Sequence, residues 1–213
     1  MSDKITCLNR GLAFLGERPI TNPDSPETPA GKHLADQFDQ CRREVLRRYP
    51  WNWAETWKAC QITTAPPFGY TNAYSFPDDC LRLIWVGDIT ETRRDFRIIN
   101  QGKPDYRKVI AIDNSGANTL NIAYTSDVTI LSQWDPLALK VLSIWLALDA
   151  AKAVTGKVEL VKMLNELLSD ELKDAVGVDG QEQATLRYTT SYVQDERDLA
   201  SFGSSLFTKV EGY

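Results

Sequence analysis

Few residues in this sequence could carry out catalysis. His33 is the only histidine, and it stands at the start of a predicted helix, where a surface or capping role is typical. Asp78 and Asp79 form a carboxylate pair that could act as acid and base beside Arg82. They follow Pro77, however, and Asp side chains in turns accept hydrogen bonds from the nearby backbone. A structural turn is the favoured interpretation, and a small enzyme using Asp78 or Asp79 is the alternative.

Cofactor and metal motifs are lacking in the sequence. Cys7, Cys41, Cys60 and Cys80 are widely spaced, so no pair has the CxxC spacing of a zinc or redox site. Glycine-rich phosphate loops, a serine nucleophile elbow and paired zinc-binding histidines do not occur either. We therefore expect no enzyme activity, no cofactor and no bound metal, and four reduced, mostly buried thiols.

Positive charge gathers in one stretch. Arg42, Arg43, Arg47 and Arg48 lie near the end of a predicted helix, mainly off its apolar face, and are candidates for contact with DNA or a neighbouring subunit. Acidic neighbours commonly neutralise such a helix face, and a nucleic-acid-binding module is the alternative. The whole chain of 213 residues has 24 Lys and Arg, 29 Asp and Glu, and a formal net charge of -5. This balance argues against a protein that coats DNA or a membrane surface through excess positive charge.

Aromatic residues gather at two places. Trp51, Trp53 and Trp57 could stack on bases, but tryptophans spaced in this way after a helix are more typical of a core that joins two layers. The final segment, residues 188–213, has neither helical nor strand period. It still carries six large apolar side chains: Tyr188, Tyr192, Phe202, Leu206, Phe207 and Tyr213. We interpret it as a C-terminal arm that contacts a partner; an arm that folds back on its own helices is the alternative.

Helical period predicts four helices, over residues 3–15, 32–49, 136–155 and 157–176. The connector between the first two contains Pro19, Pro23, Pro26 and Pro29, and we expect it to be extended and stiff. The last helix has six residues predicted to face inward: Val158, Val161, Leu164, Leu168, Leu172 and Val176. Gly177 and Gly180 then loosen the chain. The most apolar stretch, 141–154, is shorter than the ~20 residues that span a bilayer, so we expect a soluble protein made in the cytoplasm.

Between residues 57 and 134 the pattern changes to short runs rich in β-branched and aromatic residues. Predicted strands cover 57–64, 74–76, 81–86, 96–100, 109–112 and 119–124. The sequence therefore predicts an α+β fold. An antiparallel helical bundle is formed by residues 1–56 and 135–187, a small antiparallel β-rich insertion by 57–134, and an extended arm by 188–213.

Four segments of the sequence carry a resemblance to a known family. A short helix, Ile5 to Gly16, ends in Leu-Gly; residues 47–54 read Arg-Arg-Tyr-Pro-Trp-Asn-Trp-Ala; and residues 74–82 read Tyr-Ser-Phe-Pro-Asp-Asp-Cys-Leu-Arg. Asp135-Pro136 then begins an Ala/Leu-rich helix that a charged helix follows. In this order the segments resemble the tail tubular protein A family of short-tailed bacteriophages. The resemblance covers most of residues 3 to 175 and does not extend beyond 187.

The resemblance implies a structural head-to-tail adaptor. Such proteins form a ring, commonly of twelve subunits, that binds the portal protein, extends the DNA channel and docks the tail nozzle protein. The ring wall is helical and the β-rich part faces the tail. The protein would be made in the host cytoplasm, reside in the neck of the virion, and let DNA pass without specific binding. A head-completion or neck protein of a long-tailed phage is the alternative.

Overall fold

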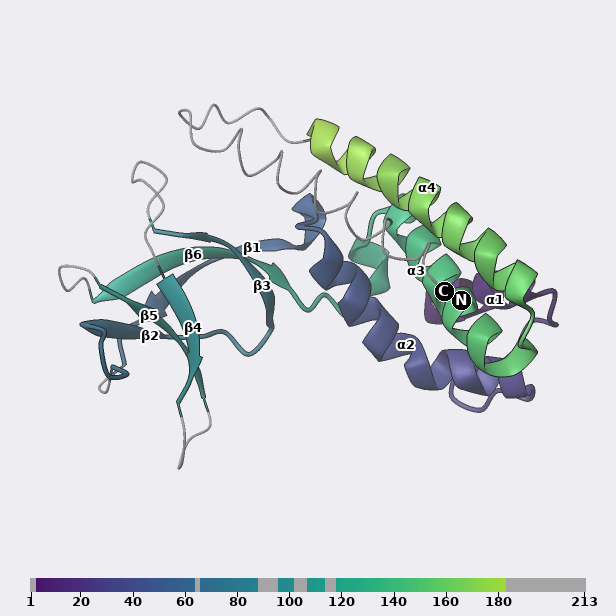
Figure 1. Cartoon of the computed structure of the whole chain (residues 1–213), viewed down its shortest axis with the longest axis horizontal. Coiled ribbons are helices and arrows are strands. Elements are labelled where there is room, and N and C mark those ends of the chain that lie inside the picture. The colour runs from purple at the N-terminus through teal and green to yellow at the C-terminus, as the bar shows by residue number, and fades with distance from the viewer. Residues whose placement is uncertain (1–2, 64–65, 88–95, 102–106, 114–117, 183–213) are drawn as a thin grey trace, which may run out of the picture. The chain divides into compact units, whose positions relative to one another are not determined.

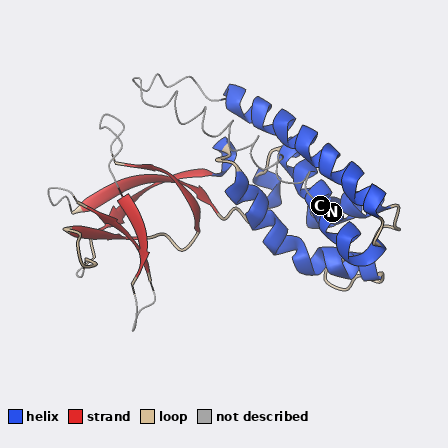
Figure 2. Cartoon of the chain, in the orientation of Figure 1, coloured by secondary structure: helices blue, strands red, loops and turns tan. Residues whose placement is uncertain are grey.

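The protein is a mixture of helices and small antiparallel sheets, which confirms the predicted α+β class (Figure 1). The computed structural model describes residues 3–63, 66–87, 96–101, 107–113 and 118–182. Within these residues the α-helices are α1 (Asp3–Leu15), α2 (Pro29–Arg48), α3 (Pro136–Ala150) and α4 (Val158–Glu182). Six strands follow α2 and precede α3, as predicted (Figure 2). The predicted C-terminal arm lies outside the described residues.

Helices α1, α2 and α3 share one apolar core. The face of α2 predicted to be apolar is buried: Leu34, Phe38, Cys41 and Val45. Helix α3 is buried around most of its circumference, as its sequence predicts, and Ser143 on it contacts Cys7 of α1 at 3.2 Å. The proline-rich connector is fixed by Asn9, whose side chain bonds both the N–H and the C=O of Ile20 at 2.8 and 3.0 Å.

Helix α2 begins at Pro29, three residues before the predicted start. Thr28 is its N-cap, and the Thr28 hydroxyl accepts a hydrogen bond from the N–H of Gly31 at 3.0 Å. Proline suits the first helical position because its missing N–H would have no helical partner there. The predicted connector was therefore wrong at its last residue.

Helix α4 continues through Gly177 and Gly180 to Glu182, beyond the predicted end at Val176. The cause is Asp179, which is buried and whose carboxylate accepts hydrogen bonds from the N–H of Asn52 at 3.2 Å. This contact holds the last turns in place. The prediction that Val158 faces inward was also wrong: it is 66% exposed, because it stands at the first position of the helix. The other five residues of the predicted inward face are buried or half-buried.

The six strands form two three-stranded antiparallel sheets. The first has the order β1 (Glu55–Gln61), β6 (Thr119–Ser126) and β3 (Cys80–Val86). The second has the order β2 (Asn72–Ser75), β5 (Lys108–Ile112) and β4 (Phe96–Asn100). One apolar core includes residues of both sheets, among them Tyr74, Ile110, Ile122 and Tyr124. Each predicted strand overlaps an observed strand, with ends that differ by up to three residues.

Gly11 lies where α1 packs tightly against α2 and α3, which predicts a specific effect of its substitution. A Cβ atom on Gly11 would lie 2.8 Å from Leu34 Cδ2 and 3.2 Å from the carbonyl oxygen of Ser143. Gly11→Ala should therefore lower the free energy of unfolding by about 1–2 kcal/mol through overpacking. Gly177 of α4 has no atom within 4 Å of such a Cβ, so Gly177→Ala should raise it by about 0.5–1 kcal/mol. Urea denaturation measures both; equal shifts of the same sign would contradict the predicted packing.

Candidate functional site

Arg42 is the buried centre of the contact between α2 and the end of β6. Its side chain is 2% exposed. The guanidinium pairs with the carboxylate of Asp127, donates to the carbonyl oxygen of Val128 at 3.0 Å, and pairs with Asp39 at 3.2 Å. The prediction that Arg42 lies off the apolar face of its helix is therefore wrong. Two carboxylates neutralise the charge, which allows burial, and the side chain has almost no surface to offer to DNA.

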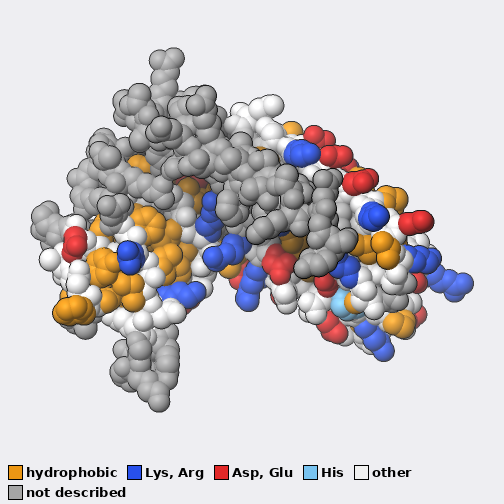
Figure 3. Space-filling view, viewed as in Figure 1, with side chains coloured by type: hydrophobic (Ala, Val, Ile, Leu, Met, Phe, Trp, Pro, Cys, Tyr) orange, Lys and Arg blue, Asp and Glu red, His pale blue; other side chains and the backbone are white. Residues whose placement is uncertain are grey.

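The other three arginines of the cluster are exposed and have different partners. Arg43 pairs with the second oxygen of Asp127 at 2.9 Å. Arg47 donates to the carbonyl oxygen of Leu81 at 2.7 Å, and the Arg48 guanidinium lies 4.8 Å from the centre of the Trp145 ring. Figure 3 shows Lys and Arg side chains gathered where β3 approaches α2. The structure thus keeps the four residues on one helix but leaves only Arg47 and Arg48 without a carboxylate partner in the described part of the chain.

Arg82 of β3 adds a further positive charge at this place. It is half-buried, and its guanidinium donates to the carbonyl oxygen of Arg48 at 3.4 Å, at the C-terminal end of α2. Burial, and secondly the charge of Arg47, lower the pKa of Arg82. The carbonyl groups at a helix C-terminus carry partial negative charge, so this end of α2 favours the guanidinium groups that reach it.

Aromatic rings connect the end of α2 to the segment before α3. Tyr49 and Trp51 have ring centres 5.1 Å apart, Trp51 and Trp53 are 5.9 Å apart, and Trp53 and Trp134 are 4.7 Å apart. Trp51 is fully buried. The predicted joining core is confirmed for Trp51 and Trp53. It is wrong for Trp57, which is 50% exposed because it lies on the outer face of β1, opposite Ala123.

The carboxylate pair Asp78 and Asp79 lies in the predicted turn, between β2 and β3. Both residues are exposed, and the N–H of Cys80 bonds the carbonyl oxygen of Pro77 at 3.2 Å across the turn. The carboxylate of Asp79 accepts the hydroxyl of Tyr124 at 3.1 Å. Burial, together with the charge of Asp79, raises the pKa of Tyr124. These contacts fix the turn onto β6.

His33 links two helices, and the four cysteines are buried. His33 Nε2 lies 3.0 Å from the Asp149 carboxylate and links α2 to α3. The four cysteines are free and buried, as predicted. Burial raises the pKa of Cys7 to about 11 and those of Cys41 and Cys80 to about 12, so these thiols stay protonated and unreactive near neutral pH.

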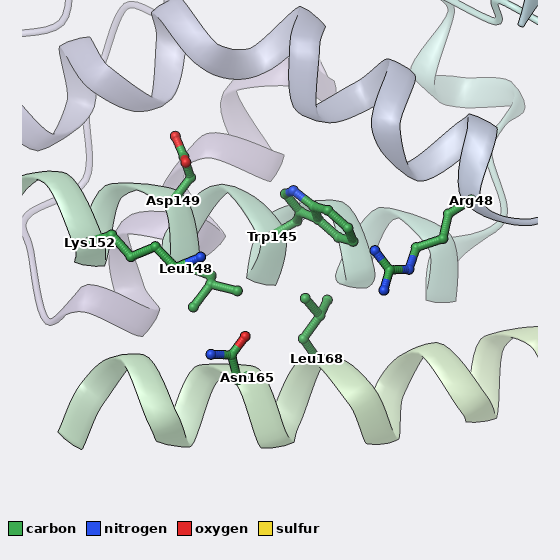
Figure 4. A pocket seen from close by; sticks show the side chains of 7 residues that line it. All are labelled: Arg48, Trp145, Leu148, Asp149, Lys152, Asn165 and Leu168. Carbon is green, nitrogen blue, oxygen red and sulfur yellow. The ribbon is translucent and has the colours of Figure 1, made fainter. Parts of the chain in front are cut away.

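A cavity of about 210 Å³ lies between α3 and α4 (Figure 4). Its apolar lining comes from Trp145, Leu148 and Leu168, and its polar lining from Arg48, Asp149, Lys152 and Asn165. In Figure 4, Arg48 stands at the Trp145 side, whereas Lys152 and Asp149 stand together at the Leu148 side, so one end carries a positive charge and the other a charge of each sign. Sequence reasoning missed this cavity, because its lining combines the end of α2 with residues of α3, the segment after it and α4, and only the folded chain brings Arg48 to the others.

In the part of the chain described by the structure, no group of three His, Cys, Asp or Glu side chains is placed to hold a metal ion. None of the helices described is both long and apolar enough to cross a membrane. The six arm residues predicted to contact a partner lie outside the described residues: Tyr188, Tyr192, Phe202, Leu206, Phe207 and Tyr213. The chain matches no model of a known protein family and no curated protein sequence.

The burial of Arg42 predicts how substitutions at the contact between α2 and the end of β6 change the free energy of unfolding. Asp127→Ala removes one of the two carboxylates that neutralise a buried charge, and should lower the free energy of unfolding by about 3 kcal/mol. Arg43→Ala is the matched control: this side chain is 60% exposed, so the change should cost at most about 1 kcal/mol. Replacing Arg42 by Met in the Asp127→Ala background should restore part of the loss. Urea denaturation checks the series, and equal costs for both single variants would contradict it.

Proposed function

We propose that this protein is a structural head-to-tail adaptor of a short-tailed bacteriophage, similar to tail tubular protein A. In this proposal it forms a ring below the portal, extends the DNA channel and docks the tail nozzle. It acts without catalysis, resides in the neck of the virion, and has the portal protein, the nozzle protein and further copies of itself as partners.

The observation that carries the proposal is where the four resembling segments lie in the fold. The first forms α1, whose end is followed by Gly16 at a φ of 72°. The second forms the aromatic joint after α2, the third the turn into β3, and the fourth the cap of α3, where Asp135 accepts the N–H of Leu137 at 2.7 Å. Each segment therefore begins or ends an element. If the family has these junctions in the same order, its chains and this one follow the same path through the fold. The resemblance implies such a common path.

The charge distribution also supports the proposal. A channel protein has to let DNA slide, and each Lys or Arg on a phosphate would hold it. Arg42 and Arg43 are neutralised within the chain by Asp127. The exposed residues of α4 include more carboxylates, among them Glu159, Glu166 and Asp170, than lysines, and Figure 3 shows acidic side chains along this helix. Carboxylates repel phosphate, so the acidic surface of this helix supports the proposal.

Removal of the arm tests the portal contact. Deletion of residues 188–213 should leave a folded chain whose binding to the candidate portal is lost, because the apolar side chains of the arm are proposed to supply the contact. Pull-down and cryo-electron microscopy of the mixture measure binding, and the full chain should give a twelve-fold ring. The matched variant Phe202→Ser/Phe207→Ser controls for chain length and should weaken binding in the same direction. Unchanged portal binding by both variants would refute this role of the arm.

The salt dependence of DNA binding separates the adaptor from a nucleic-acid-binding module. Only Arg47 and Arg48 of the cluster lack a carboxylate partner among the described residues, so a logarithmic plot of DNA affinity against salt should have a slope of about -2 or shallower. Fluorescence anisotropy with duplex DNA measures this slope. Arg47→Ala/Arg48→Ala should flatten it, while Arg43→Ala should leave it unchanged. A slope steeper than about -4 would favour the nucleic-acid-binding module instead.

A further inference from the structure

Phe68 occupies the tip of the connection between β1 and β2, and its side chain is fully exposed. Turn tips are ordinarily built from small and polar residues. Here the N–H of Tyr70 bonds the carbonyl oxygen of Pro67 at 3.1 Å, and Gly69 has a φ of 90°. The positive φ at the third position is that of a type II turn, in which Phe68 takes the second position. The turn therefore presents an aromatic ring to solvent.

Prolines on one side and hydrogen bonds on the other restrain this turn. Pro66 and Pro67 fix two backbone φ angles on one side of Phe68. On the other side, the N–H and the hydroxyl of Thr71 both donate to Asp113, which follows β5, each at 2.9 Å. An aromatic side chain on a pre-ordered support loses little conformational entropy on binding. Such residues make strong anchors in protein interfaces.

The cavity between α3 and α4 is complementary to such a ring. Its volume of about 210 Å³ gives room for a benzene-sized ring, since about 150 Å³ is enough for benzene, and its lining is polar as well as apolar. Trp145, Leu148 and Leu168 provide apolar contact. Arg48 stands at one end, with its guanidinium 4.8 Å from the centre of the Trp145 ring, and Lys152 stands beside Asp149 at the other. A cation near the face of an aromatic ring attracts it. The cavity is thus suited to an aromatic side chain.

We propose that Phe68 of one copy of this protein inserts into the α3–α4 cavity of a second copy. Because the turn and the cavity are different surfaces of the same chain, the contact is heterologous and leaves a free turn and a free cavity at the two ends of every pair. Repetition of such a contact builds a ring when the rotation closes. The inference rests on the proposed function and deepens it, because it names the contact that joins neighbouring subunits of the adaptor.

Directed disulfide formation tests this contact in the full chain. A Phe68→Cys chain is mixed with an Asn165→Cys chain, which carries the new thiol at the wall of the cavity, under mild oxidation. We expect the mixed disulfide in at least tenfold excess over either homodimeric product. The four native cysteines are buried and protonated, so they do not compete. Ser25→Cys, on an exposed loop, replaces Phe68→Cys in the matched control and should give no mixed product.

A second measurement does not depend on cysteine chemistry. Phe68→Ala should weaken self-association of the chain at least tenfold in analytical ultracentrifugation, whereas Phe68→Tyr should retain it. Both variants should melt at the temperature of the unmodified chain, because the side chain is fully exposed.

The outcomes separate this contact from the adaptor role. If the unmodified chain binds the portal as a ring but Phe68→Ala assembles equally well and no mixed disulfide forms, the contact is refuted and the adaptor proposal stands. If the chain stays monomeric at every concentration with and without portal, the contact is refuted as well. A mixed disulfide and a weakened Phe68→Ala variant, in a chain that does not bind portal, would establish the contact and count against the adaptor.

Discussion

The chain passes from the helices to the strands after α2, and it returns from the strands to the helices before α3. The rest of the structure depends on holding these two crossings together. The outward crossing ends at Ala54 and the returning one begins after Ser126, whose hydroxyl donates to the carbonyl oxygen of Ala54 at 3.0 Å. The strands that flank the crossings, β1 and β6, pair with each other. The ring contact between Trp53 and Trp134 and the ion pair between Arg42 and Asp127 then fasten both crossings to the helices. The hydrogen bonds of Arg47 and Arg82 between α2 and β3 add to these contacts.

This arrangement explains why a charge is buried at the joint. Arg42 reaches a carboxylate and a backbone carbonyl in the returning crossing, and its planar guanidinium can satisfy both at once. A hydrophobic residue could fill the same volume but would leave the carbonyl oxygen of Val128 with one donor fewer. Both contacts of Arg42 require the observed alignment of α2 with the residues that follow β6. The ion pair therefore favours this alignment, in addition to any contribution to stability.

The sequence predicted the parts of the fold that depend on local pattern. The strands and three of the four helix starts follow from period, capping residues and prolines, as at Asp135-Pro136. It did not predict the extension of α4, because the glycines that weaken a helix locally are outweighed by Asp179, whose partner Asn52 is far away in the chain. Arg42 was misplaced for the same reason: only the folded chain brings Asp127 to it. The α3–α4 cavity and the exposure of Phe68 likewise depend on tertiary packing, although an aromatic residue within a proline and glycine turn is a signal that can be read from sequence.

The pairing of the two crossings has a mechanical consequence. A force that pulls the sheets away from the helices acts on both crossings at the same time, because they are bonded side by side at Ala54 and Ser126. The two chain segments and the contacts that connect them share the load. Either segment can extend only after these contacts have broken. A chain built in this way carries tension between strands and helices through both crossings together.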